Sequence, residues 1–155
     1  MLDRIWTNQR SILLSRVIVY FFAITLLAMD LGGVWLADQF GHLISVQRMT
    51  ENGGLYFMIC LYGCSLPAYV VLYGLHKLLV NIRDEKVFVQ ENVSILRRIS
   101  WCMFIAMAIC MAFCWPLPIL SVVVLSAGFI GLIVRVVKNV FERAIQMKQE
   151  LDLTI

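Results

Sequence analysis

The sequence predicts an all-α chain that folds as an integral membrane four-helix bundle with both termini in the cytoplasm. Hydrophobic residues make up 61% of the 155 positions, four apolar runs are long enough to cross a bilayer, and basic residues gather on one side of them. A soluble domain is nearer one half apolar, and each helical crossing needs roughly 20 apolar residues. We therefore expect a single transmembrane domain over residues 1–155.

The four spans follow from the apolar runs, because backbone amides in lipid must be hydrogen-bonded within their own segment. The uncharged stretch from Ile99 to Val134 is too long for one crossing. Pro116 and Pro118 divide it, since proline removes a backbone donor and disfavours helical geometry in the residue before it. The expected spans cover residues 12–31, 53–75, 99–115 and 118–137.

Lysine and arginine predict the orientation of these spans. Twelve of the thirteen precede or open the first span, lie between the second and third, or follow the fourth, and only Arg48 lies on the other side. Cytoplasmic segments of membrane proteins carry this basic excess. A loop over residues 76–98, a tail helix over 138–155 and both termini are therefore predicted to be cytoplasmic. The first span has no cleavage site near its end and is predicted to be an uncleaved signal anchor.

Asp30 leaves two registers open for the first span. In one register the carboxylate lies inside the membrane, at a cost of about 2.5 to 3.5 kcal/mol on insertion scales. In the other, which we favour, the span ends at Leu31 to Gly33 and Asp30 lies near the outer headgroups. Residues 34–44 would then form a partly amphipathic helix on the outer surface. His42 and His76 have no partner at metal-ligand spacing.

Small residues recur every four positions in the second and third spans. They are Cys60, Cys64 and Ala68 in one, and Cys102, Ala106, Cys110 and Cys114 in the other. Residues four apart share a helix face, and small residues let membrane helices approach closely. The rows predict a seam in which cysteine acts as a small hydrophobe, and a cysteine pair across the two spans is geometrically possible. A thiol oxidoreductase would need a reactive thiolate, yet no C-x-x-C motif is present.

A methionine row in the third span offers an alternative. The candidate metal ligands are Met103, Met107, Met111, Cys110 and Cys114. Thioether and thiolate together select copper(I), which makes a small transporter or channel subunit for copper(I) or another solute the alternative hypothesis. Methionine is also an ordinary gap-filler in apolar cores, and the spans show no clear polar pore lining. We therefore predict no bound metal or cofactor.

The segments around the second and fourth spans carry the specific polar sequence. "NIRDEKVFVQENVSILRRIS" and, at the C-terminus, "FERAIQMKQELDLTI" resemble the YoaS-like bacterial four-span membrane family, a domain of unknown function numbered twenty-nine seventy-five. The residues that carry the resemblance are Val87, Phe88, Glu91, Asn92, Leu96, Arg97, Ala144, Glu150, Asp152, Leu153, Thr154 and Ile155. Lys86, Val89 and Ser100 depart from the glycine, hydroxyl residue and glycine that the family often has. The resemblance implies an inner-membrane protein without assigned activity, whose members frequently neighbour a small helix-turn-helix regulator in the genome.

These observations predict a non-enzymatic interaction or regulatory protein. Its expected partners are the lipid bilayer, a cytoplasmic protein such as a helix-turn-helix transcription regulator, and further copies of itself, with no direct contact to nucleic acid. The candidate partner-binding residues are Phe88, Asn92, Arg97, Glu150, Asp152 and Thr154. Each of them could instead only hold the loop or the C-terminus in place, because buried polar groups need hydrogen-bond partners.

Overall fold

The computed structural model describes residues 2–45, 53–114 and 120–153, and the side chains of residues 13–39, 54–114 and 120–151. All regular structure in these residues is helical, which confirms the all-α prediction. The helices are α1 (Leu2–Leu31), α2 (Gly33–Ser45), α3 (Gly53–Arg83), α4 (Gln90–Ala112) and α5 (Leu120–Leu153). Arg48, Pro116 and Pro118, on which the predicted outer loops depend, lie outside the described residues.

The four long helices have the lengths and surfaces of membrane spans. Each of α1, α3, α4 and α5 contains a stretch that is long and apolar enough to cross a bilayer. Large apolar side chains face outward on them, and Ile24, Phe21 and Leu125 are 69%, 65% and 75% exposed. Water disfavours such a surface, whereas lipid solvates it.

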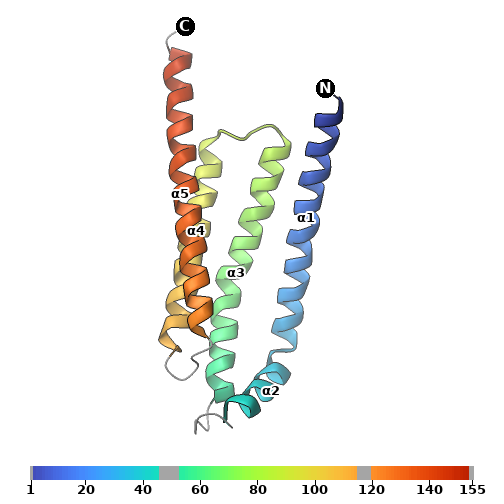
Figure 1. The fold of residues 1–155 in the computed structure, drawn as a ribbon, viewed down its shortest axis with the longest axis vertical. Coiled ribbons are helices and arrows are strands. Elements are labelled where there is room, and N and C mark those ends of the chain that lie inside the picture. Colours follow the sequence, from blue (N-terminus) through green and yellow to red (C-terminus); the bar gives the residue numbers. More distant parts are fainter. Residues whose placement is uncertain (1, 46–52, 115–119, 154–155) are drawn as a thin grey trace.

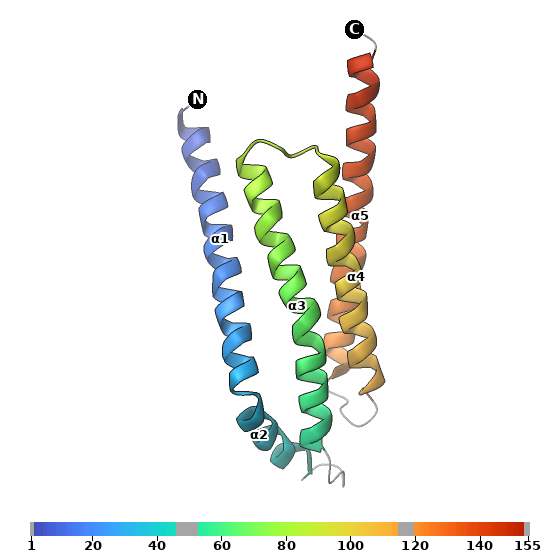
Figure 2. The same ribbon diagram turned by 180° about the vertical axis from the view of Figure 1, so that it is seen from behind.

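The long helices pack in the order α1, α3, α4, α5, each against its neighbour in that row. Figures 1 and 2 show α1 at one side of the row and α5 at the other, with α2 against one end of α3. Because α4 contacts both α3 and α5, it holds much of the buried core. Its buried residues are Asn92, Val93, Ile95, Leu96, Ile99, Ser100 and Cys110.

Glycines allow close approach on both sides of α4. A Cβ at Gly74 of α3 would lie 3.1 Å from Cγ1 of Ile99, and a Cβ at Gly131 of α5 would lie 3.2 Å from Cβ of Met103. The Ser100 hydroxyl also donates a hydrogen bond to the Gly131 carbonyl at 3.1 Å. Membrane helices gain association energy from such close contacts, since lipid supplies no hydrophobic drive between them.

The two ends of the row differ. The N-terminus, the C-terminus and the α3–α4 connection lie at one end, which we call the turn end, while α2 lies at the other, which we call the α2 end (Figure 1). At the α2 end the chain passes from α1 to α2 through Gly32, whose N–H donates to the Ala28 carbonyl and whose carbonyl accepts from Leu36. At the turn end α5 continues past the α3–α4 connection, so the predicted fourth span and tail form one helix.

Candidate functional site

The α3–α4 connection, residues 84–89, begins with a Schellman C-cap on α3. The Lys86 N–H donates to the Asn81 carbonyl at 2.9 Å, and the Glu85 N–H donates to the Ile82 carbonyl at 3.1 Å. This pair of bonds requires a left-handed residue between helix and loop, and Glu85 takes that place with a φ of 59°. A residue with a Cβ is disfavoured there by about 1 kcal/mol, so the turn forms against local backbone strain.

Asn92 holds the connection from inside. Its side chain is fully buried, and Nδ2 donates to the carbonyls of Lys86 and Val87, both at 2.8 Å. Its Oδ1 accepts a hydrogen bond from Nδ2 of Asn81 at 2.7 Å. The N-cap residue Val89 makes no side-chain hydrogen bond to the first turn of α4, so the Asn92 side chain fixes the backbone before this helix. Asn92 therefore acts on any partner only through the shape of the turn.

A second polar contact ties α3 to α4 at the same level. Lys77 of α3 forms an ion pair with Glu91 of α4. Nδ2 of Asn81 also lies 3.4 Å from Oε2 of Glu91, so the ion pair joins the buried amide pair. The Lys77 and Glu91 side chains are 41% and 49% exposed, and exposed ion pairs contribute little to stability. The buried amides therefore carry more of the turn's stability than the charges do.

Two contacts connect the turn end to α5. The rings of Phe88 and Phe141 lie 5.8 Å apart, while Phe88 remains 51% exposed. Arg97 of α4 faces Glu142 of α5 at 3.6 Å, and Glu142 also pairs with Lys138 at 2.7 Å. The structure thus places the predicted residues Phe88 and Arg97 against α5.

The C-terminal part of α5, from Val140 onward, has an exposed apolar face. Ile145 is only 7% exposed, whereas Val140, Met147 and Leu151 are 59%, 58% and 68% exposed. Val140, Ala144, Met147 and Leu151 recur at intervals of four, three and four, which places them on one helix face. We call these four residues the α5 stripe. Glu150 lies in the same segment of α5, and the Asp152 side chain and Thr154 lie outside the described residues.

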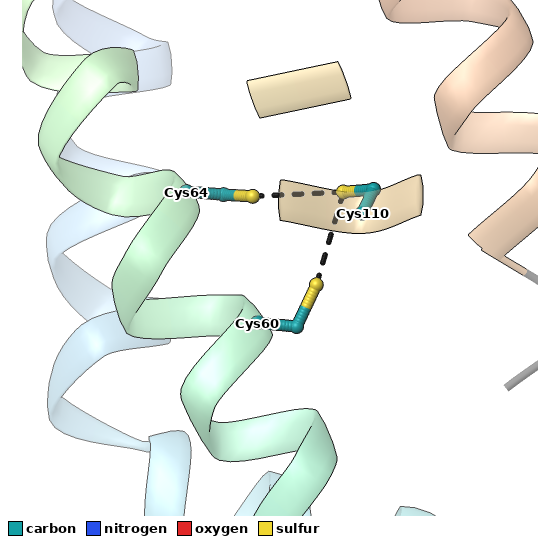
Figure 3. A group of neighbouring side chains, drawn as sticks. All are labelled: Cys60, Cys64 and Cys110. Carbon is teal, nitrogen blue, oxygen red and sulfur yellow. Dashed lines mark hydrogen bonds between the residues drawn. The ribbon is translucent and has the colours of Figure 1, made fainter. Parts of the chain in front are cut away.

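Nearer the α2 end, three cysteines converge between α3 and α4 (Figure 3). Cys110 Sγ lies 3.8 Å from Sγ of Cys60 and 3.6 Å from Sγ of Cys64. All three sulfurs lie within 4.8 Å of one another. Cys60 and Cys110 are 5% and 3% exposed. The cysteine contact that the sequence allowed across two spans is thus a cluster of three thiols.

The methionines of α4 lie elsewhere. A Cβ at Gly128 of α5 would lie 2.8 Å from the Met107 sulfur, and Met103 lies against Gly131. Met103 and Met107 therefore pack against α5, whereas Cys110 points to α3. The two remaining metal candidates, Met111 and Cys114, lie in the last turn of α4 and just after its end. Sequence reasoning named Cys110 but not Cys60 or Cys64 as a ligand.

Asp30 lies one residue before the end of α1 and is held by two tyrosines of α3. The Tyr69 hydroxyl donates to Oδ2 at 2.9 Å, and the Tyr62 hydroxyl donates to the Asp30 carbonyl at 3.0 Å. Oδ1 is buried without a hydrogen-bond partner among the described residues. These contacts fasten α1 to α3 near the α2 end.

The fold is that of a multi-pass helical membrane protein. Its long apolar helices expose apolar surfaces, and its buried polar groups are mostly hydrogen-bonded. The family model described as "Protein of unknown function (DUF2975)" matches residues 11–155, and the chain belongs to this family. The match confirms the predicted membership of the domain of unknown function numbered twenty-nine seventy-five. Comparisons with curated proteins and with solved structures give no match.

Proposed function

We propose that this chain is a non-enzymatic protein of the bacterial inner membrane that docks a cytoplasmic protein at its turn end. In this proposal both termini and residues 84–89 face the cytoplasm, as the basic residues predict. The observation that carries the proposal is the α5 stripe, an apolar face on a helix that continues past the α3–α4 connection.

The position of the stripe argues for a protein partner. Arg135 and Lys138 mark the expected membrane surface on α5, since basic residues gather at the cytoplasmic boundary. From Lys138 to Leu151 the helix rises about 20 Å at 1.5 Å per residue. Much of the stripe would therefore lie beyond the lipid tails. Burying one large apolar side chain there contributes about 1.5 to 3 kcal/mol, which favours a covering partner.

The chemistry of the stripe argues for a helical partner. The stripe residues are four, three and four positions apart, which is the spacing of the apolar anchors in helix-to-helix recognition. Arg143 and Lys148 lie in the same segment of α5 and would form a polar rim around the stripe. Phe88 adds a half-exposed aromatic ring beside α5, in a turn that Asn92 holds rigid. Aromatic anchors on rigid supports are typical of binding hot spots. The helix-turn-helix regulator implied by the family resemblance is an all-helical partner of this kind.

A direct binding measurement tests the proposal. The chain is reconstituted in lipid nanodiscs, and its affinity for a purified small helix-turn-helix regulator, the kind of partner that the family resemblance implies, is measured by fluorescence anisotropy. The double variant Met147→Glu/Leu151→Glu is expected to bind at least about tenfold more weakly, because burial of each side chain is worth more than 1.4 kcal/mol. The matched control Gln146→Glu/Gln149→Glu adds the same charge at exposed polar positions and should bind like the natural chain.

Two results would overturn the proposal. One is that the natural chain does not bind the regulator, or that both double variants bind it equally well. The other concerns topology, which is tested with a protease site fused after Ile155. Cleavage by protease added to intact spheroplasts would place the C-terminus outside the cell, whereas protection until the membrane is permeabilised supports the cytoplasmic placement.

A further inference from the structure

The three-thiol cluster has the dimensions of a metal site. Three sulfurs that surround one ion at about 2.3 Å, in a plane, lie about 4.0 Å from one another. Cys110 Sγ is 3.6 Å from Cys64 Sγ and 3.8 Å from Cys60 Sγ, and the whole group fits within 4.8 Å. Changes of less than about 1 Å in the sulfur–sulfur distances therefore convert the contacts into a three-coordinate site.

We propose that Cys60, Cys64 and Cys110 bind one copper(I) ion between α3 and α4. Thiolates are soft ligands that select copper(I) and zinc from the divalent and monovalent ions available to proteins. Zinc takes four ligands in structural sites, usually in a tetrahedron. Within the described residues the cluster contains three sulfurs and neither histidine nor carboxylate, which suits an ion that accepts three ligands.

Copper(I) binding at this cluster is a proton exchange without electron transfer. Cysteine binds metals as the thiolate, so each thiol that becomes a ligand gives its proton to water as the copper–sulfur bond forms. The copper remains in the same oxidation state, so no electron is transferred. Because binding releases protons, the apparent affinity should rise with pH.

The helices position the three ligands without help from a loop. Cys60 and Cys64 are four residues apart on one face of α3, and Cys110 lies two residues before the end of α4. Cys60 is seven residues from the first residue of α3, which corresponds to about 10 Å along the helix. Cys64 is only partly buried. An ion that enters from the α2 end therefore travels a short distance to reach the cluster.

Competition titration under anaerobic, reducing conditions tests the proposal. Purified chain in detergent micelles is titrated with copper(I) in the presence of a coloured copper(I) chelator. We expect one equivalent per chain to be withheld from the chelator, with near-ultraviolet absorption from sulfur-to-copper charge transfer. X-ray absorption of the loaded natural chain should show about three sulfur ligands near 2.3 Å.

Variants then assign the ligands. Cys110→Ser removes the sulfur that touches the other two, and should weaken binding by at least about a hundredfold, because even outer-shell partners of metal ligands contribute up to that factor. Cys102→Ser and Met107→Leu are matched controls from α4 that should leave the affinity unchanged, since Cys102 is outside the cluster and Met107 lies against Gly128. Cys64→Ser serves as a second test in case Cys110→Ser does not fold.

The outcomes separate cleanly. Stoichiometric binding that is lost in Cys110→Ser or Cys64→Ser and kept in both controls supports the site. Absence of stoichiometric binding to the natural chain overturns it, as does equal binding by the cluster variants, or an absorption spectrum with nitrogen or oxygen ligands. A result at this site does not bear on the docking proposal, whose residues lie at the turn end.

Discussion

Replacing Asn92 with alanine tests whether a single buried amide holds the turn end together. The side chain makes three hydrogen bonds, two as donor to the carbonyls of Lys86 and Val87 and one as acceptor from Asn81. Each such bond contributes about 1 kcal/mol net, so Asn92→Ala should lower the free energy of unfolding by about 3 kcal/mol. This is a large part of the 5 to 15 kcal/mol typical of a folded domain.

Equilibrium unfolding in mixed micelles measures this loss. The chain is titrated with dodecyl sulfate in a mild detergent, and unfolding is followed by circular dichroism and by the fluorescence of its four tryptophans. Asn139→Ala is the matched control, because Asn139 is an exposed asparagine of α5 and exposed substitutions change stability by less than about 0.5 kcal/mol. The expected difference between the two variants is therefore about 3 kcal/mol.

Asn92→Asp separates hydrogen bonding from shape. Aspartate fills the same volume and keeps an acceptor for Asn81, but it cannot donate to the two backbone carbonyls as a carboxylate. It should destabilise the chain at least as much as alanine does, because a buried charge faces the two carbonyl oxygens. If Asn92→Asp is tolerated, or if Asn92→Ala matches Asn139→Ala, the turn is not held by these bonds.

Two further substitutions have predicted signs under the same dodecyl sulfate titration. Glu85→Gly should stabilise the chain by about 1 kcal/mol, because glycine accepts the left-handed conformation without steric cost; the neighbouring Asp84→Gly, where φ is negative, should not stabilise it. Gly131→Leu should destabilise it by about 1 to 3 kcal/mol, since its Cβ would press on the Met103 Cβ, which cannot rotate away. Asn139→Leu, which adds leucine at an exposed position of α5, should have a much smaller effect, and equal losses would contradict the close contact.

The helices could be predicted from the sequence because lipid imposes a simple rule. A span must satisfy its own backbone hydrogen bonds, so apolar length alone indicates a helix. The predicted helix over residues 34–44 corresponds to α2, because Gly32 and Gly33 follow a run that has already reached the length of a span. The non-helical connection between α3 and α4 covers residues 84–89, inside the predicted loop, since the Schellman cap stops α3 at Arg83.

The contacts within the two candidate sites could not be predicted from the sequence. A four-residue row shows that residues share a face, but it does not say which neighbour that face meets. Cys110 and Met107 lie within one turn of α4, yet one points to α3 and the other to α5. The partner of Asn92 was equally hidden, because Asn81 lies on another helix and pairs with it only in the folded register. The sequence offered one signal, since Asn81 and Asn92 both lie within the predicted loop over residues 76–98.

The order of helices in the row explains why the two proposals are separable. α4 is in contact with both α3 and α5, and the polar turn lies at its start while the thiols lie near its end, about 20 residues apart. At 1.5 Å per residue this is about 30 Å of continuous helix. A rigid helix transmits a signal between its ends only where it has two discrete arrangements. Asn92 fixes α4 at one end and close glycine contacts fix it along its length, so α4 favours a single arrangement. A metal bound by Cys110 therefore stabilises the α3–α4 pair without moving the α5 stripe, and loss of either site leaves the other in place.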